Sequence, residues 1–295
     1  MRVYILLLVL AVALGAYVVE AKSNTTVSPV SDGAVTKVLG IFTVKKDPGV
    51  LKKQVANAIG DSWKNYSVLV SDLNSGFSMG INEHEVFSAA SVNKLPIMAV
   101  LYDQSQHGAV NFDQIITLQA VDIQDYGTGS IRYDPPGSTY SVKTLVRLMM
   151  QKSDNTAAFL LGNYVVDLAN IQSIINSWGM TQTDMINNQT SNADMELLLS
   201  KIVRGNVANP SATSEMLGFM HDSDFEDRLP VLVPKDAVVY HKVGSGETGE
   251  VHDVGVVVHG NTRYYVGILT TNVPDPDAAA KLIARVSKVI YDFMD

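Results

Sequence analysis

Patterns typical of β-strands occupy two distant blocks of this 295-residue chain, with a long stretch of helical periodicity between them. The first block, 66–87, alternates apolar and polar residues around an Asn-Ser-Gly turn at 74–76. The second block contains three strand-like runs before a final helix from about Pro276: 237–244, 251–260 and 263–271. We therefore expect an α/β fold of the α+β type. One antiparallel sheet is built from both termini with flanking helices, and an all-helical domain is inserted between its halves.

Local signals place the boundaries of these parts. Asp47-Pro48 is typical of a helix start, because aspartate caps the first turn and proline fits the first helical position. We expect residues 47–90 and 235–295 to form the α/β domain and residues 91–234 to form the inserted helical domain. The chain is long enough for one large core or two smaller ones.

The first residues resemble a secretory signal. A basic residue at position 2 precedes an uncharged apolar stretch, 3–19, and the tripeptide at 19–21 suits a signal peptidase. The stretch is also nearly long enough to span a bilayer, so residues 1–21 are expected to be either a cleaved signal peptide or a membrane anchor. Residues 22–46 are expected to be a flexible spacer. Both alternatives predict export to the periplasm, to the extracellular space or to the outer face of a membrane.

Composition excludes several classes of function. The net charge is −8, from 22 Lys+Arg against 30 Asp+Glu, which argues against nucleic acid as a partner. The absence of cysteine excludes disulfides and thiolate catalysis. The six histidines show no zinc-like spacing, and we expect neither a metal nor a cofactor. We expect the protein to be a monomer.

A serine and a lysine stand at the head of an apolar helix. The run 95–102 carries no charge, and a helix that is apolar all round is buried. Ser91 precedes Lys94 by three residues, a spacing that places both side chains on one helix face. A lysine whose pKa is lowered by burial can remove the proton of a serine hydroxyl. Taken alone, the pattern is explained at least as well by a serine N-cap beside a lysine whose amine reaches solvent as by a catalytic pair.

Two later motifs make the catalytic interpretation more specific. Ser153-Asp154-Asn155 interrupts two apolar helical segments, and His241-Lys242-Val243-Gly244 places a lysine on an apolar strand. Each motif alone has an ordinary explanation, a helix cap in the first case and an edge-strand lysine in the second. The ordered set S-x-x-K, S-D-N and K-x-G is far less common by chance than any member of it.

In this order the motifs resemble those of the class A β-lactamase family of penicillin-recognising serine hydrolases. The similarity extends to "GTGSI", "PGSTYSVKTLVRLM" and "HKVGSGETGEVHDVGVVV", and it covers roughly residues 60–290. It implies four catalytic side chains: Ser91, Lys94, Ser153 and Lys242. It also implies four substrate-binding residues: Asn155, Arg228, Gly244 and Ser245.

The resemblance gives each catalytic residue a role. Ser91 is the acylated nucleophile and Lys94 is its general base or proton relay. Ser153 bridges the two lysines and passes a proton to the leaving nitrogen, while Lys242 supplies positive potential for the substrate carboxylate. The backbone N–H groups of Ser91 and Ser245 form the oxyanion hole.

The substrate-carboxylate region departs from the family pattern. The family usually has a hydroxyl residue after the lysine of the third motif, where this chain has Val243. The arginine that many members carry after that strand is also absent from "GETGEVHD". Arg228 lies where some members supply a guanidinium from the other side. A surface ion pair with Asp227 or Glu226 explains Arg228 equally well.

The larger departure concerns deacylation. Class A enzymes carry a glutamate on a long Ω-loop that activates the hydrolytic water. Here one helix is expected to end near Trp178 and the next to begin at Ser191, whose spacing to Asp194 resembles a capping box. The loop between them contains no glutamate, and Asp184 is its only carboxylate. Glu196 falls inside the following helix, where we expect a structural role.

Three functions remain open at this point. We expect an exported serine hydrolase that opens β-lactam rings through a Ser91 acyl-enzyme. The first alternative is a D-Ala-D-Ala carboxypeptidase or penicillin-binding protein that turns over β-lactams slowly. The second is a domain that senses β-lactams or peptidoglycan fragments. All three predict a β-lactam or a peptidoglycan stem peptide as the small-molecule partner.

Overall fold

The computed structural model describes residues 46–295. The predicted signal peptide or anchor, and the predicted spacer up to residue 45, lie outside the described residues. Among the described helices, none is by itself long and apolar enough to cross a membrane. One pair, Asn155–Val165 and Leu168–Ser177, meets the length and composition criteria jointly but is bent by 84°.

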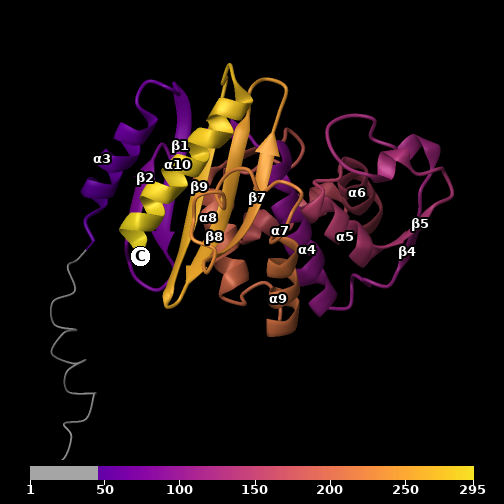
Figure 1. Ribbon diagram of the computed structural model, residues 1–295. Coiled ribbons are helices and arrows are strands. Elements are labelled where there is room, and N and C mark those ends of the chain that lie inside the picture. The colour runs from indigo at the N-terminus through magenta and orange to yellow at the C-terminus, as the bar shows by residue number, and fades with distance from the viewer. Residues whose placement is uncertain (1–45) are drawn as a thin grey trace, which may run out of the picture. The chain divides into compact units, whose positions relative to one another are not determined.

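A five-stranded antiparallel sheet with the strand order β2-β1-β9-β8-β7 forms the centre of the fold (Figure 1). Its strands are β1 (Asn65–Asp72), β2 (Ser78–Ile81), β7 (Val238–Ser245), β8 (Val251–His259) and β9 (Thr262–Thr271). β1 of the first block pairs with β9 of the second, with Val68 opposite Ile268. The prediction of an antiparallel sheet built from both ends of the folded chain is therefore confirmed.

Two helices, α3 (Pro48–Ile59) and α10 (Pro276–Met294), cover one face of the sheet (Figure 1). Asp47 caps α3 as predicted, because its carboxylate accepts a hydrogen bond from Gly49 N at 2.8 Å. β1 shows why the sheet needs a layer on each side. Val68 and Val70 pack with α3 and α10, whereas Leu69 packs in the core on the opposite face, as the two-residue period of a strand requires.

The opposite face of the sheet is covered by the block between the two sets of strands. Its helices are α4 (Lys94–Gln106), α5 (Val142–Gln151), α6 (Asn155–Leu160), α7 (Leu168–Ser177), α8 (Asn192–Val203) and α9 (Pro210–Phe219), with a π-helical turn, η5 (Leu161–Val165), and 3-10 turns η2 (Ala90–Asn93), η3 (Ala120–Asp122) and η4 (Ile131–Tyr133). The block is not purely helical. β4 (Ile115–Thr117) pairs with β5 (Thr139–Ser141), and β3 (Val86–Ser88) pairs with β6 (Gln189–Ser191).

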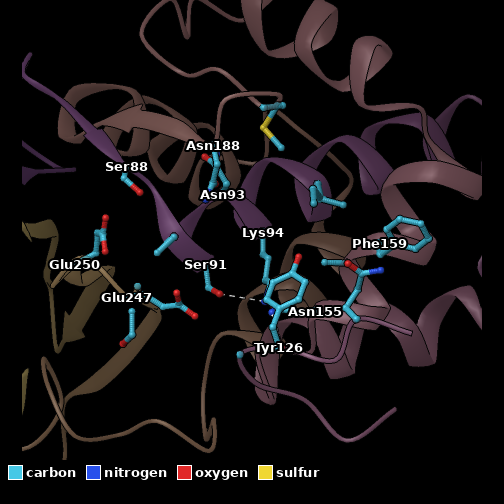
Figure 2. Close-up of a pocket in the computed structure, with 18 of the residues that line it drawn as sticks. Ser88, Ser91, Asn93, Lys94, Tyr126, Asn155, Phe159, Asn188, Glu247 and Glu250 are labelled. Carbon is cyan, nitrogen blue, oxygen red and sulfur yellow. Dashed lines mark hydrogen bonds between the residues drawn. The ribbon is translucent and has the colours of Figure 1, made fainter. Parts of the chain in front are cut away.

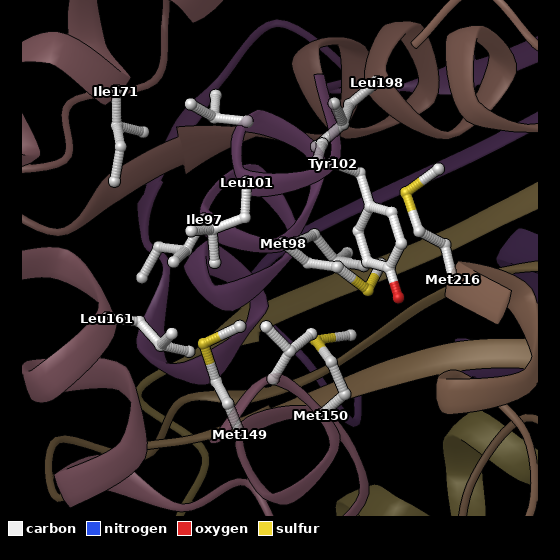
Figure 3. Packing of buried hydrophobic residues seen from close by; sticks show 14 of the residues in the cluster. Ile97, Met98, Leu101, Tyr102, Met149, Met150, Leu161, Ile171, Leu198 and Met216 are labelled. Carbon is white, nitrogen blue, oxygen red and sulfur yellow. The ribbon is translucent and has the colours of Figure 1, made fainter. Parts of the chain in front are cut away.

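α4 is the central helix of this layer, and all its residues from Lys94 to Tyr102 are buried. Figure 3 shows its side chains in contact with methionines and leucines of α5, η5, α8 and α9. The prediction of a helix that is apolar all round is therefore confirmed. The helix begins at Lys94 and not at Ser91, because Ala90–Asn93 forms the 3-10 turn η2 in front of it. Dense packing of α4 fixes the position of the turn that carries Ser91.

Candidate active site

The turn η2 presents Ser91 to a cavity between the sheet and the helical layer (Figure 2). Ala90, directly before it, has φ 47°. Left-handed backbone is uncommon for a residue with a Cβ, and here it turns the chain sharply between β3 and α4. Lys94 Nζ lies 3.0 Å from Ser91 Oγ. The predicted pairing of these two side chains is therefore present in the structure.

Lys94 Nζ is surrounded by four oxygen atoms. Besides Ser91 Oγ, it lies 2.6 Å from Ser153 O, 3.2 Å from Ser153 Oγ and 2.7 Å from Asn155 Oδ1. Burial lowers the pKa of Lys94 to about 7, although the charge of Asp154 opposes the shift. A neutral amine has two N–H groups, which the carbonyl of Ser153 and the amide of Asn155 can accept. Its lone pair is then free to take the proton of Ser91.

The second motif is both a helix cap and a wall of the site. Asp154 caps α6 by accepting a hydrogen bond from Ala157 N at 2.9 Å. Its second oxygen accepts from Ser130 N and Ile131 N at 2.6 and 2.9 Å, and so fixes the glycine-rich loop 125–130. Gly129 has φ 123°, and a Cβ there would lie 2.5 Å from Asp154 Cγ. Only glycine allows the loop to lie this close to the motif.

β7 brings the third motif to the other side of Ser91. A Cβ on Gly244 would lie 3.0 Å from Ala89 O and 3.3 Å from Ala90 Cβ, so glycine lets the strand approach the turn before Ser91. Ser245 follows at the end of β7 and lines the same cavities as Ser91. The two residues whose N–H groups the resemblance assigns to the oxyanion hole thus line the same cavities.

Lys242 is buried within this motif, and its Nζ lies 3.4 Å from Val243 O and 5.9 Å from the centre of the Phe225 ring. Burial, helped by the nearby charge of Lys94 and opposed by that of Asp253, lowers the pKa of Lys242 well below its usual value. Ser153 Oγ contacts Lys94, but no hydrogen bond between described residues joins it to Lys242. The expected bridge between the lysines is present on one side only.

Arg228 supplies the permanent cation at this end of the site. Its guanidinium is buried and donates to Gly244 O at 2.9 Å, to His252 O at 2.6 Å and to Ser245 Oγ at 2.6 Å. Asp227 lies 3.6 Å from Arg228 Nε, so the anticipated ion pair exists beside these bonds. Arginine stays protonated even when buried. The structure thus places Arg228 next to the end of β7 and not at a free surface.

A buried histidine for which the sequence predicted no role ties the segment before Arg228 to the sheet. His241 Nδ1 lies 2.9 Å from Asp253 and Nε2 lies 3.2 Å from Glu226. Burial alone would lower the pKa of His241, but the two carboxylates outweigh it and raise the pKa to about 9. Asp253 also accepts from Leu229 N at 3.0 Å. The signal in the sequence was a histidine, His241, directly before Lys242 on an otherwise apolar strand.

The cavity beside Ser91 has a volume of about 650 Å³, which is within the range of small-molecule sites. It is lined by Ser91, Lys94, Tyr126, Asn155, Phe159 and Glu247, among other residues. A smaller cavity of about 80 Å³ shares Ser91, Gly127, Asn155 and Ser245 with it and reaches Ser153 and Val243. Of the eight residues expected at the site, these cavities touch Ser91, Lys94, Ser153, Asn155 and Ser245. Neither cavity is lined by Arg228, Lys242 or Gly244.

The loop before α8 does not direct its carboxylate into the cavity. Asp184 Oδ1 accepts from Ile186 N and Asn187 N, both at 2.9 Å, and Oδ2 accepts from Asn187 Nδ2 at 2.7 Å. These bonds with Asn187 lower the pKa of Asp184. The side chains of this loop that line the cavity are Met185 and Asn188. Asp184 therefore stabilises its own loop.

The start of α8 differs in one detail from the expected capping box. Ser191 Oγ accepts from Asp194 N at 3.1 Å, as predicted. The carboxylate of Asp194, however, accepts from Gln182 N and Thr183 Oγ1, both at 2.8 Å, and so fixes the beginning of the loop. Glu196 accepts from Ser200 Oγ at 2.8 Å within the helix, which agrees with the structural role expected for it.

Comparison with known proteins agrees with this geometry. The chain matches the beta-lactamase enzyme family over residues 50–294. A β-lactamase of Bacteroides uniformis is 23% identical over 246 residues, which cover 74% of this chain and 83% of the relative. The structure of PBP-A is 27% identical with a TM-score of 0.75, covering 82% of this chain and 95% of PBP-A. A PBP-A mutant with glutamate in place of a leucine, solved as an acyl-enzyme with penicillin G, is 26% identical with a TM-score of 0.76, covering 83% of this chain and 96% of that one.

The family match spans the sheet, both flanking helices and the whole helical layer. It confirms the resemblance inferred from the three motifs and the prediction that the protein is an enzyme, a serine hydrolase of the β-lactamase type. The chain belongs to the beta-lactamase enzyme family.

Proposed function

We propose that this protein opens β-lactam rings through an acyl-enzyme on Ser91. The observation that carries the proposal is the 3.0 Å approach of Lys94 Nζ to Ser91 Oγ inside a largely buried site. Lysine is the only titratable group that contacts the nucleophile among the described residues. The PBP-A mutant, which was solved as an acyl-enzyme with penicillin G, supports the same chemistry for a related cavity.

Acylation then uses the residues of all three motifs. Lys94 takes the proton of Ser91 Oγ, which attacks the lactam carbonyl carbon, and the oxyanion lies between the N–H groups of Ser91 and Ser245. As the C–N bond breaks, Ser153 Oγ gives its proton to the nitrogen and regains one from Lys94, 3.2 Å away. The proton removed from the nucleophile thus ends on the leaving nitrogen, and the active-site lysine is neutral again.

The substrate carboxylate belongs at the end of β7. Ser245 is exposed there, and its Oγ accepts a hydrogen bond of 2.6 Å from the buried guanidinium of Arg228. The positive charge of Arg228 therefore lies next to an exposed hydroxyl. Lys242 adds a second cation only when it is protonated, and its lowered pKa disfavours this in the free site. A bound carboxylate favours the charged form. Lys242 therefore acts as an electrostatic partner that is charged on binding of the anion.

The alternative function is a D-Ala-D-Ala carboxypeptidase of the penicillin-binding type. It is favoured by the loop 179–190, which has no glutamate. The one carboxylate of this loop, Asp184, accepts hydrogen bonds from the backbone N–H groups of Ile186 and Asn187. The similarity to PBP-A at 27% identity points the same way. A β-lactam or peptidoglycan-fragment sensor needs only the acylation half of the same chemistry.

Intact-mass measurement over time after mixing with penicillin G tests these functions. A transient adduct of one penicillin per chain is the result expected for a β-lactamase. An adduct that persists, with release of D-alanine from a stem pentapeptide, would favour the carboxypeptidase, and a persistent adduct without that release would favour the sensor. No adduct at all would overturn acylation by Ser91.

We propose further that residues 1–21 direct export and that the mature protein acts as a monomer outside the cytoplasm. The apolar stretch 3–19 and the tripeptide at 19–21 support the first part. Edman sequencing of the mature protein tests it, since cleavage after residue 21 gives a new N-terminus whereas an anchor leaves the chain whole. Light scattering of the purified protein tests the second part, because a mass of two or more times that of the mature chain would contradict a monomer.

A further inference from the structure

A buried amide beside Ser91 carries an unused hydrogen-bond acceptor. Asn93, two residues after Ser91, is 5% exposed and lines the large cavity. Its Nδ2 donates to Asn188 Oδ1 at 2.9 Å, but its Oδ1 receives no hydrogen bond from any described residue. A buried acceptor without a donor destabilises the folded state. Such an atom beside a reactive serine indicates a ligand or water that donates to it.

The loop opposite Asn93 is built to hold this amide in position. Asn188 accepts a hydrogen bond from Ala89 N at 2.8 Å through its own carbonyl, so its backbone is tied to the segment just before Ser91. Its backbone is left-handed, with φ 51°. The loop is closed by a pair of 2.9 Å bonds between Asp184 and Gln189. Figure 2 shows Asn93 and Asn188 side by side on the wall of the cavity.

The same cavity contains few groups that could activate a water molecule. Glu250 is buried, and its carboxylate accepts from the N–H and hydroxyl of Thr248. Glu247 lies on the exposed turn after β7. Lys94 directly follows Asn93 in the chain and faces the reacting serine at 3.0 Å. An oriented acceptor and a titratable amine thus line the same cavity as Ser91.

We propose that Asn93 Oδ1 orients the hydrolytic water of deacylation and that Lys94 takes the proton of this water, an inference that rests on the proposed acyl-enzyme. One O–H of the water donates to Asn93 Oδ1 and the other points to Lys94 Nζ. The water oxygen forms a bond to the ester carbonyl carbon as its proton moves to Lys94. The C–Oγ bond then breaks, Lys94 returns the proton to Ser91 Oγ, and the product leaves as a carboxylic acid.

The acyl-enzyme leaves Lys94 free for this role. Once Ser91 Oγ is part of an ester it has no proton to give, so the lone pair of the amine faces the position of an incoming water. Burial keeps the pKa of Lys94 near 7, so the neutral form is well populated at neutral pH. Asn93 therefore acts as a positioning residue, and Lys94 serves as the base in both halves of the cycle.

The test compares acylation and deacylation by intact mass with penicillin G in the full-length chain. Asn93→Leu keeps the size of the side chain and removes its acceptor, and it should lengthen the life of the acyl-enzyme at least about tenfold, with acylation unchanged. Asn188→Ala breaks the same Asn93–Asn188 bond but keeps the acceptor, so its effect should be clearly smaller. Asn93→Asp retains an acceptor oxygen and should restore deacylation. If Asn93→Leu does not fold, Asn93→Ala takes its place.

Equal acyl-enzyme lifetimes for wild type and Asn93→Leu would overturn the inference. An effect of Asn188→Ala as large as that of Asn93→Leu would overturn it too, because it would mean that Asn93 only holds the loop. Loss of deacylation in Glu247→Gln would place the base on the turn after β7 and overturn it as well. In each of these cases acylation still occurs. If wild type forms no adduct, the proposed function fails, and this inference fails with it.

Discussion

Two residues beside the reactive groups adopt a backbone conformation that side chains disfavour. Ala90 and Ser153 have φ angles of 47° and 50°, and such residues cost on the order of 1–3 kcal/mol each. Ala90 turns the chain so that Ser91 faces the cavity, and Ser153 turns it so that both its carbonyl and its hydroxyl reach Lys94. The contacts of both turns, with β7 and with the loop 125–130, hold these conformations in place.

The nucleophile can be tested with a single substitution. Ser91→Ala removes the hydroxyl and nothing else, and among the described residues the Ser91 hydroxyl is hydrogen-bonded only to Lys94. We expect this variant to retain its melting temperature and to lose covalent labelling by a fluorescent penicillin, measured on a denaturing gel. Labelling at the wild-type level in a folded variant would remove Ser91 from the mechanism.

The pH dependence of acylation should report the protonation of Lys94. Burial lowers the pKa of Lys94 to about 7, and only the neutral amine can accept the proton of Ser91. The second-order rate of acylation should therefore fall as the pH drops below about 7, by roughly tenfold per pH unit once the amine is mostly protonated. Stopped-flow acylation between pH 5 and pH 9 gives this profile.

Lys94→Arg is the matched variant for this measurement. A guanidinium stays protonated at any usable pH and cannot act as a base. We expect acylation to be severely slowed at every pH and to show no rise through neutral pH. If the arginine variant acylated at the wild-type rate, Lys94 would be an electrostatic or structural residue and the base would lie elsewhere.

At the level of single residues, the sequence predicted what depends on neighbours along the chain. The pairing of Ser91 with Lys94 follows from a three-residue spacing, and a helix cap at Ser153 or Asp154 follows from their place before an apolar segment. The bonds of Asn93 and Arg228 could not be predicted in the same way. They depend on where the loops 184–189 and 223–229 come to lie, and those loops are positioned by contacts distant in sequence.

Among the elements, the pair β7 and β8 supports both the cation and the third motif. His241 on β7 lies between Asp253 on β8 and Glu226 in the segment that precedes Arg228. Gly255 stands opposite His241 in the register, and a Cβ there would lie 2.7 Å from His241 Cβ. The glycine thus makes room for an imidazolium between two carboxylates, and this cluster ties the segment of Arg228 to the sheet.

This cluster predicts a specific dependence of stability on pH. The two carboxylates raise the pKa of His241 from its ordinary 6.5 to about 9 in the folded protein. The interaction of the His241 imidazolium with the two carboxylates therefore stabilises the folded protein fully below pH 6.5. This contribution is lost as the pH rises through 9. The lowered pKa values of Lys94 and Lys242 give the protein an opposite slope over the same pH range. The test is therefore the difference in the free energy of unfolding between wild type and His241→Gln, from urea titrations between pH 6 and pH 10, which should fall as the pH rises. A difference that does not change with pH would contradict the role of the imidazolium.

Helix starts were the most predictable elements, because capping is local. Asp47 and Ser191 accept the backbone hydrogen bonds expected of N-caps. The three-residue strands β4, β5 and β6 carry too few residues to show a period and were missed, whereas β3 lies at the end of the strand-like block 66–87. β6 matters for function, since its pairing with β3 fixes the loop 184–189 against the segment before Ser91.

At the scale of the whole molecule, the site joins elements from three separate stretches of chain. Ser91 and Lys94 come from the start of α4, Ser153 and Asn155 from the turn before α6, and Ser245 from the end of β7. The order of the motifs was visible in the sequence alone. Their convergence requires β1 and β9 to pair, which closes the sheet across the helical block. The acylation machinery is therefore complete only in the folded whole.

The deacylation machinery is less complete, and this imbalance gives the last prediction. Acylation has a base, a proton relay and a candidate oxyanion hole around Ser91. The second step has no carboxylate from the loop 179–190, since Asp184 accepts hydrogen bonds from the backbone of its own loop. We expect the first step to be faster than the second, so that the acyl-enzyme accumulates.

Rapid mixing with a chromogenic β-lactam should then show a burst of about one equivalent per chain, followed by slow steady turnover. The size of the burst must scale with the enzyme concentration, and Ser91→Ala, which lacks the nucleophile, serves as the control that should show none. Fast turnover without a burst would mean that deacylation is not limiting. A loss of that turnover in Asp184→Asn would then identify Asp184 as the base. Its carboxylate would in that case have to leave the N–H groups of Ile186 and Asn187 to reach the ester.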